Sequence, residues 1–128
     1  MQYAASAAES NRGTSLLDHY RAQLTRVPFG LAVAASLVVL FTPESGVPVA
    51  PPGTDKVVHL LLFAALAITG RMAGLRRPLL PGLLAYAVLS EVAQGLLPIG
   101  RSFDPVDIGF DALGAVAGWT VVAVSRRG

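Results

Sequence analysis

The sequence predicts an all-α membrane protein in which four transmembrane helices form a compact bundle with N and C termini in the cytoplasm. The first observation is composition: of 128 residues, 53% are hydrophobic and only 14% are charged, against about 25% charged in soluble domains. The mean hydropathy is +0.58. The second is a series of apolar segments separated by polar loops, and the third is an uneven distribution of basic residues among those loops. A small soluble fold could not hide this apolar surface, whereas lipid accepts it.

Composition also excludes several classes of site. The chain has no cysteine, so it contains no disulfide, thiolate metal site or cysteine nucleophile. Its pI near 9.5 would fit nucleic-acid binding, but the basic residues do not cluster with aromatic residues. We therefore expect no nucleic-acid partner, and the length favours a single folded domain.

Four apolar segments are expected to be membrane spans. The first, at about 16 residues, is short for a span, which needs about 20. The third begins with a proline that suits a first helical turn. The segments run from about Val27 to Thr42, from Val57 to about Leu75, from Pro78 to Leu97 and from about Pro105 to Val124.

The segments divide the chain into two parts. Residues 1–26 are a polar lead, expected to be partly disordered or to form an interfacial helix near Leu16–Leu24, and residues 27–125 are the four-span domain. The lead is long for a signal peptide, and Pro48-Val49-Ala50 is a poor cleavage site, so we expect an uncleaved first span. The Pro/Gly-rich stretch TPESGVPVAPPGT then separates the first two spans as a loop.

Charge sets the expected orientation. Eight of the ten Lys and Arg residues lie before the first segment, between the second and third, or after the fourth: Arg12, Arg21, Arg26, Arg71, Arg76, Arg77, Arg126 and Arg127. The opposite loops hold only Lys56 and Arg101. The positive-inside rule then places both termini on the cytoplasmic side of a bacterial cytoplasmic membrane. The loops Pro43–Lys56 and Pro98–Pro105 are expected on the outer side.

Most of the acidic residues gather on that outer side. Six of the eight fall in the outer loops or at the outer ends of the segments: Glu44, Asp55, Glu91, Asp104, Asp107 and Asp111. Asp55 and His59 are four residues apart and share a helix face, and Glu91 and Gln94 are three apart. The last three aspartates follow an i, i+3, i+7 pattern. The spacing therefore predicts one polar site built by three helices.

Simpler interpretations stay open for several of these residues. Asp104 and Asp107 suit a helix N-terminus because of the helix dipole, and Asp55 could cap the second helix. Glu91 lies in an apolar run, where a charge costs roughly 2.5–3.5 kcal/mol at the bilayer centre, so it needs a partner. Structural ion pairing could absorb the charges without any activity. The small residues of Gly114–Gly118 allow close helix packing, either within the bundle or between copies in a homo-oligomer.

Three short motifs resemble those of VanZ-like proteins. DKVVH at Asp55–His59, followed by Phe63, resembles the opening motif of that family, and SEVAQ at Ser90–Gln94 resembles its S-E-x-x-Q element. Its R-x-x-x-x-x-D-x-x-x-N-x-x-G element resembles the spacing of Arg101, Asp107, Asp111 and Gly114, with Asp104 inside it. Asp111 stands where the family usually has asparagine, which adds a carboxylate. The resemblance implies a cell-envelope protein linked to resistance to the glycopeptide teicoplanin.

The expected function is to process or bind a lipid-linked, phosphate-containing substrate at the outer leaflet. Lys56 and Arg101 would hold the phosphate, with Asp55, Gln94 and Asp104 completing the substrate site. His59 would shuttle protons or act as a ligand. The remaining carboxylates would bind a divalent metal ion or act as general acid and base: Glu91, Asp107 and Asp111.

Two other functions use the same residues. A non-catalytic module would bind a membrane lipid, a lipidated antibiotic or a partner protein. A proton-coupled transporter would use the carboxylates and histidine as a relay, but the inner halves of the spans lack polar residues to continue a path. The sequence leaves open whether the protein is an enzyme.

Overall fold

The computed structural model describes residues 2–127, with the side chains of residues 2–12 and 14 left out of the description. The described chain is all-α: α1 (Gln2–Phe41), the short 3₁₀ turn η1 (Glu44–Gly46), α2 (Thr54–Met72), α3 (Leu79–Leu96) and α4 (Pro105–Ser125). No strand occurs among these residues. The all-α class and the last three helices are confirmed to within a few residues.

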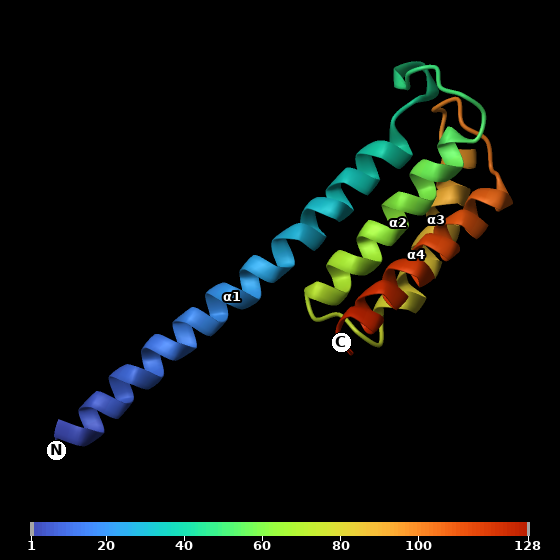
Figure 1. The fold of residues 1–128 in the computed structure, drawn as a ribbon. Helices are drawn as coiled ribbons and strands as arrows, with labels where there is room; N and C mark the ends of the chain where they lie inside the picture. The colour runs from blue at the N-terminus through green and yellow to red at the C-terminus, as the bar shows by residue number, and fades with distance from the viewer. Residues whose placement is uncertain (1, 128) are drawn as a thin grey trace.

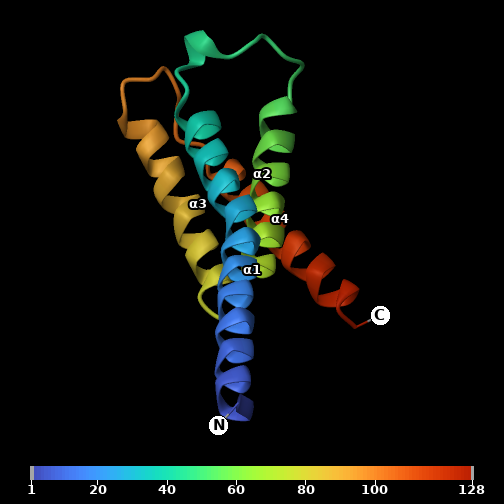
Figure 2. The ribbon, with the colours of Figure 1, turned by 90° about the vertical axis from the view of Figure 1, so that its left-hand side faces the viewer.

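The four helices form a bundle with the two longer loops at one end. Figure 1 shows α2, α3 and α4 side by side and α1 running past them, so that its N-terminal half extends beyond the bundle. Figure 2 shows α1 in front, with α3 and α2 on either side and α4 crossing behind. The C-terminus and the α2–α3 turn lie at the end opposite the two longer loops (Figure 1).

α1 is longer than the first apolar segment predicted. Its apolar part runs over 27 residues, Ser15–Phe41, because the chain stays helical before Val27 and continues through Pro28. Residues 2–26 belong to this same helix, and Met1 lies outside the described residues. The division into a polar lead and a four-span domain stays a prediction.

Three helices of the described chain are long and apolar enough to cross a membrane: Ser15–Phe41 within α1, and α3 and α4. The protein is therefore a multi-pass membrane protein. α2 is not among the three, because Asp55 and Lys56 stand at its start and Arg71 at its end.

Local signals explain where the helices stop. Gly74 has a φ of 90°, and its N–H donates to the carbonyl of Arg71 while that of Leu75 donates to Gly70. These two bonds form a Schellman motif, which requires the left-handed conformation that glycine adopts most readily. α3 ends just before Pro98, as expected from the restriction that a proline places on the preceding residue. α4 starts with Pro105 in its first turn and Asp104 as N-cap.

The core lies between the helices and contains a hydrogen bond between two hydroxyl groups. Its buried apolar side chains include Phe63 and Leu66 from α2 and Leu83 from α3. The Phe63 and Tyr86 rings pack with centroids 5.6 Å apart. The Tyr86 hydroxyl lies 2.8 Å from that of the buried Ser36, which links α3 to α1.

α2 and α4 approach closely where two glycines of α4 lie. A Cβ added at Gly114 would overlap the carbonyl of Leu60, and one at Gly118 would lie 2.5 Å from the carbonyl oxygen of Ala64. The small residues of Gly114–Gly118 therefore pack within the bundle. They bring the α4 backbone against the α2 backbone, as small residues do between membrane helices.

Gly114→Ala is expected to destabilise the bundle, because the added methyl group must push α4 away from the Leu60 carbonyl. Overpacking of this kind costs about 1–3 kcal/mol, which outweighs the gain of roughly 1 kcal/mol from replacing a helical glycine with alanine. Thermal unfolding in detergent measures the effect.

Gly109→Ala is the matched control for this experiment. Gly109 lies on the exposed face of the same helix, and nothing stands within 4 Å of an added Cβ. It should leave stability unchanged or raise it slightly. Equal behaviour of the two variants would contradict the importance of the α2–α4 contact.

Candidate functional site

The polar residues predicted to form a site gather where α2 begins, α3 ends and α4 begins, beside the two longer loops (Figure 1). Several of them are fully enclosed: His59, Glu91 and Asp111 are 1%, 0% and 0% exposed. Gln94 and Asp107 are also buried, whereas Asp55 is exposed. Buried charged groups of this kind require partners.

His59 and Asp111 form the innermost pair. The Nδ1 atom of His59, on α2, lies 2.8 Å from Oδ1 of Asp111, on α4. Oδ2 of Asp111 is buried, and none of the described residues forms a hydrogen bond with it. Because an ionised carboxylate only accepts hydrogen bonds, this contact places a proton on Nδ1 and directs Nε2 away from Asp111.

The other ring nitrogen of His59 faces two further carboxylates. Nε2 lies 3.8 Å from Oδ1 of Asp55 and 3.9 Å from Oδ2 of Asp107. Both distances exceed the length of a hydrogen bond. The spacing of Asp55 and His59 along one face of α2 is thus confirmed, and α4 supplies the opposite side.

Lys56 connects this cluster to the start of α4. Its Nζ lies 3.0 Å from Oδ1 of Asp107 and 3.0 Å from Oδ2 of Asp104. The Lys56 side chain is 32% exposed, so the pair sits at the edge of the site. Lys56 thus pairs with two carboxylates, whereas from the sequence it was expected to bind the phosphate of a substrate.

Asp104 has two structural roles. Its Oδ1 accepts a hydrogen bond of 2.9 Å from the backbone N–H of Val106, as an N-cap does. Its Oδ2 pairs with Lys56. The Lys56 ammonium first, and then the Val106 N–H, lower the pKa of this carboxyl below its ordinary value. The capping interpretation of Asp104 is therefore correct, and the ion pair is added to it.

Glu91 finds its partner in the loop before α4. Its Oε1 accepts a hydrogen bond of 2.7 Å from the backbone N–H of Asp104. Its Oε2 is buried and has no hydrogen-bond partner among the described residues. Glu91 is thus a fully enclosed carboxyl group with one oxygen engaged and one not.

Arg101 and Gln94 donate hydrogen bonds to carbonyl groups at the end of α1 and not to the carboxylates of the cluster. Arg101 donates from Nε to the carbonyl of Thr42 at 2.9 Å and from Nη2 to that of Val39 at 3.3 Å. Gln94 donates from Nε2 to the carbonyl of Leu40 at 2.6 Å. These are carbonyls that the end of a helix leaves without partners, and a positive charge there also complements the helix dipole.

The predicted site residues therefore divide into two groups. Seven of the nine lie in the connected cluster: Asp55, Lys56, His59, Glu91, Asp104, Asp107 and Asp111. The donors of Arg101 and Gln94 point to α1. For a metal ion, the described residues that group within reach of one another are Asp55, His59 and Asp107, a different trio from the predicted Glu91, Asp107 and Asp111.

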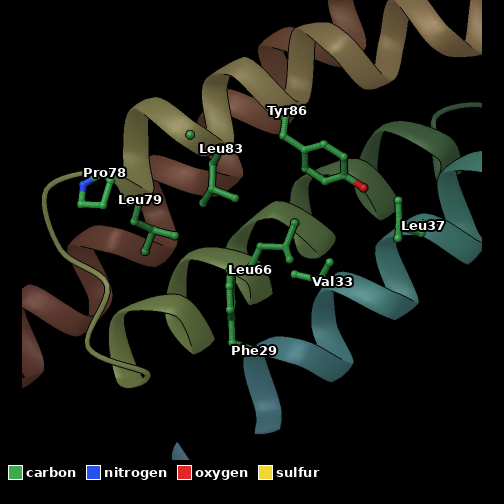
Figure 3. A pocket seen from close by; sticks show the side chains of 9 residues that line it. Phe29, Val33, Leu37, Leu66, Pro78, Leu79, Leu83 and Tyr86 are labelled. Atoms are coloured by element: carbon green, nitrogen blue, oxygen red, sulfur yellow. The ribbon is translucent and has the colours of Figure 1, made fainter. Parts of the chain in front are cut away.

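An apolar groove between α1 and α3 was not predicted from the sequence. The groove encloses about 290 Å³, and side chains of α1, α2 and α3 line it (Figure 3). Phe29 and Val33 come from α1, Leu66 from α2, and Leu83 and Tyr86 from α3. Tyr86 in the apolar run AYAVLSE indicated a helix–helix contact, because a buried tyrosine needs a partner for its hydroxyl; the groove itself depends on how α1 packs against α3, which no motif indicates.

Asp104→Asn tests the ion pair, because asparagine keeps an N-cap acceptor but carries no charge. The folded-state pKa of Asp104 is lowered from 3.8, so its charge stabilises the fold above that pH and stops doing so as the pH falls through the lowered folded-state pKa. We expect wild type to unfold at a higher temperature than the variant at pH 7, and the gap to close below pH 3.8. A gap that does not vary with pH would contradict the pair. Asp104→Ala, which also loses the cap, should remain less stable at every pH.

Comparison with known proteins supports the motif analysis. The chain matches the family model described as VanZ/LLP1 over residues 3–126, which extends well beyond the three motifs. No curated protein matches the chain, and no solved structure matches it. The match covers nearly the whole sequence, so the chain belongs to the VanZ/LLP1 family.

Proposed function

We propose that the chain crosses the bacterial cytoplasmic membrane four times, with both termini in the cytoplasm and the polar cluster facing outward. The basic residues support this orientation, because Arg71, Arg76 and Arg77 lie in or beside the α2–α3 turn and Arg126 follows α4. Arg71 also stacks over Trp119, 4.0 Å from the ring centroid, as cations and aromatic residues do at membrane interfaces. α2 would then be the fourth span, with one face packed against the other three helices and an apolar face that includes Val57 and Leu61 exposed to lipid.

The function proposed for the cluster is to bind and process a lipid-linked, phosphate-containing molecule of the cell envelope. The observation that carries this proposal is the enclosed set of His59, Glu91 and Asp111, in which both carboxylates keep one unpartnered oxygen. The large majority of buried side-chain polar atoms in folded proteins have a hydrogen-bond partner, so two oxygens in one cluster that form no hydrogen bond with any described residue support a functional role. Glu91 would act as general acid and base toward the substrate, and His59 would act as a proton shuttle or as a ligand.

The groove between α1 and α3 suits the lipid part of such a substrate. Its floor residue Leu66 follows His59 by seven positions on α2, and Phe63 lies between them on the same buried face. Tyr86 precedes Glu91 by five positions on α3. The groove therefore continues the helices of the polar cluster about one to two turns further into the bundle. A chain lying in it would place a head group at the cluster.

The phosphate itself would meet Lys56 at the edge of the cluster. Its ammonium already pairs with Asp104 and Asp107, so phosphate would have to share it with those carboxylates. Arg101 is engaged with the end of α1. Few cationic groups are thus free to receive an anion.

Glu91→Gln tests the catalytic role. Glutamine keeps the acceptor for the Asp104 N–H but cannot exchange a proton, so the fold should survive while kcat/KM falls by about 10²–10⁴. Purified protein in nanodiscs would be supplied with polyprenyl pyrophosphate and, separately, with phospholipid. Released phosphate and the lipid product are then measured by mass spectrometry.

Glu44→Gln is the control, since Glu44 is an exposed carboxylate in η1 near the same loops and outside the cluster. It should retain wild-type turnover. Full activity in Glu91→Gln would refute the catalytic role of Glu91. Stoichiometric lipid binding by wild type without product would favour a non-catalytic module for a lipid or a lipid-tailed antibiotic, a function consistent with the internal pairing of Lys56.

Gly82→Phe tests the groove. Gly82 lines it, and an added Cβ meets nothing within 4 Å, so a side chain can start here without a clash at its first atom, and we expect the ring to occupy groove space. We expect KM for a long-chain substrate to rise about 10-fold or more, from the loss of burial for two or more methylene groups, with kcat retained. Gly109→Phe, on the exposed face of α4, should change neither constant. An unchanged KM in Gly82→Phe would rule out the groove as the tail site.

A further inference from the structure

We propose that Asp55, His59 and Asp107 bind a single divalent transition-metal ion, and that Asp111 positions His59 from behind. The three ligand atoms lie within 4.8 Å of one another. The ion site follows from geometry alone, while its role toward phosphate rests on the proposed function.

The distances around Nε2 of His59 are those of atoms that can share an ion. Two tetrahedral zinc ligands, each roughly 2.0–2.1 Å from the ion, lie about 3.3 Å apart. Nε2 stands 3.8 Å from Asp55 and 3.9 Å from Asp107, which is too far for hydrogen bonds and about half an ångström wider than a bound ion requires. Inward movement of the two carboxylates by that amount would complete the set.

Each buried ligand is oriented by a second partner. Asp111 accepts from Nδ1 of His59 at 2.8 Å, which leaves the lone pair of Nε2 directed at the other carboxylates. Lys56 holds Oδ1 of Asp107, which leaves Oδ2 for the ion. Carboxylate–histidine–metal arrangements of this kind fix the tautomer of the ring and raise its basicity.

Charge balance favours a cation at the same place. The carboxyl groups of Asp55, Asp107 and Asp111 lie around the His59 ring, and among the described residues Lys56 is the one ammonium paired with any of them. Unbalanced negative charge is costly in a buried environment. A divalent ion would neutralise it and would attract the phosphate that Lys56 alone receives poorly.

The donor set indicates the type of ion. One imidazole nitrogen and two carboxylate oxygens suit zinc or manganese, whereas magnesium and calcium prefer oxygen ligands throughout. Three protein ligands leave further positions open to water or a substrate oxygen, as in catalytic zinc sites.

The experiment measures ion binding directly. The full-length chain without a histidine tag, in detergent micelles, is treated with EDTA, freed of the chelator and titrated with ZnCl₂ by calorimetry. We expect one Zn²⁺ per chain, with the ion raising the unfolding temperature. His59→Gln should weaken binding at least 100-fold. His19→Gln is the matched control, since His19 is the other histidine of the chain and lies exposed on α1; it should bind like wild type.

Two further variants keep the outcome decisive if His59→Gln fails to fold. Asp55 is exposed, so Asp55→Asn should fold normally and bind Zn²⁺ at least 10-fold more weakly. Asp111→Asn keeps an acceptor for Nδ1 and should bind about 10–100-fold more weakly, as expected for an outer partner of a metal ligand. Absence of saturable Zn²⁺ binding to wild type, or wild-type binding by Asp55→Asn, would overturn the proposal.

Different experimental results would refute the ion site and the proposed function. Saturable Zn²⁺ binding without conversion of any lipid substrate leaves the ion site standing and refutes processing. Lipid conversion that persists in EDTA, by a protein that does not bind Zn²⁺, refutes the ion site and leaves processing standing.

Discussion

The close contact between α2 and α4 is the constraint on which the polar cluster depends. Gly114 lies against the carbonyl of Leu60, which is the residue after His59, and Asp111 stands one turn before Gly114 on α4. The 2.8 Å contact between His59 and Asp111 therefore exists only while the two backbones touch. The distance between two helices in a lipid environment depends on packing and not on the hydrophobic effect. One methyl group added at Gly114 would therefore act directly on the contact between His59 and Asp111.

The same contact explains how charged groups are tolerated inside an apolar bundle. α2 carries charges at both ends and a histidine near its start, and it is not among the three described helices that are apolar enough on their own to cross a membrane. Its buried face holds His59, Phe63 and Leu66, and α4 supplies the carboxylates that His59 requires. Pairing lowers the cost of burying each group. α2 thus depends on its neighbours for its place in the membrane, and the cluster depends on α2.

Much of this arrangement could be predicted from the sequence, because it follows from helical periodicity. Asp55 and His59 share a face, and Asp107 and Asp111 face α2, as their spacing indicated. The partners of Arg101 and Gln94 could not be predicted, since the free carbonyls of Val39, Leu40 and Thr42 come from the end of another helix. Nε2 of His59 faces Asp55, and Nδ1 faces Asp111. This assignment depends on the orientation of the imidazole ring, which the spacing of the residues along the sequence does not determine.

Hydrogen bonds between α1 and α3 also connect the groove with the polar cluster. Gln94 is held to α1 through Leu40 and lies one turn beyond Glu91 on α3. Tyr86 on the same helix bonds Ser36 of α1. These two bonds fix the spacing of α1 and α3 on either side of the position of Glu91, and Tyr86 marks the end of the groove nearest the cluster. α3 is therefore tied to α1 on both sides of the helix turn that carries Glu91, so the wall of the groove and the proposed acid–base group belong to one braced helix.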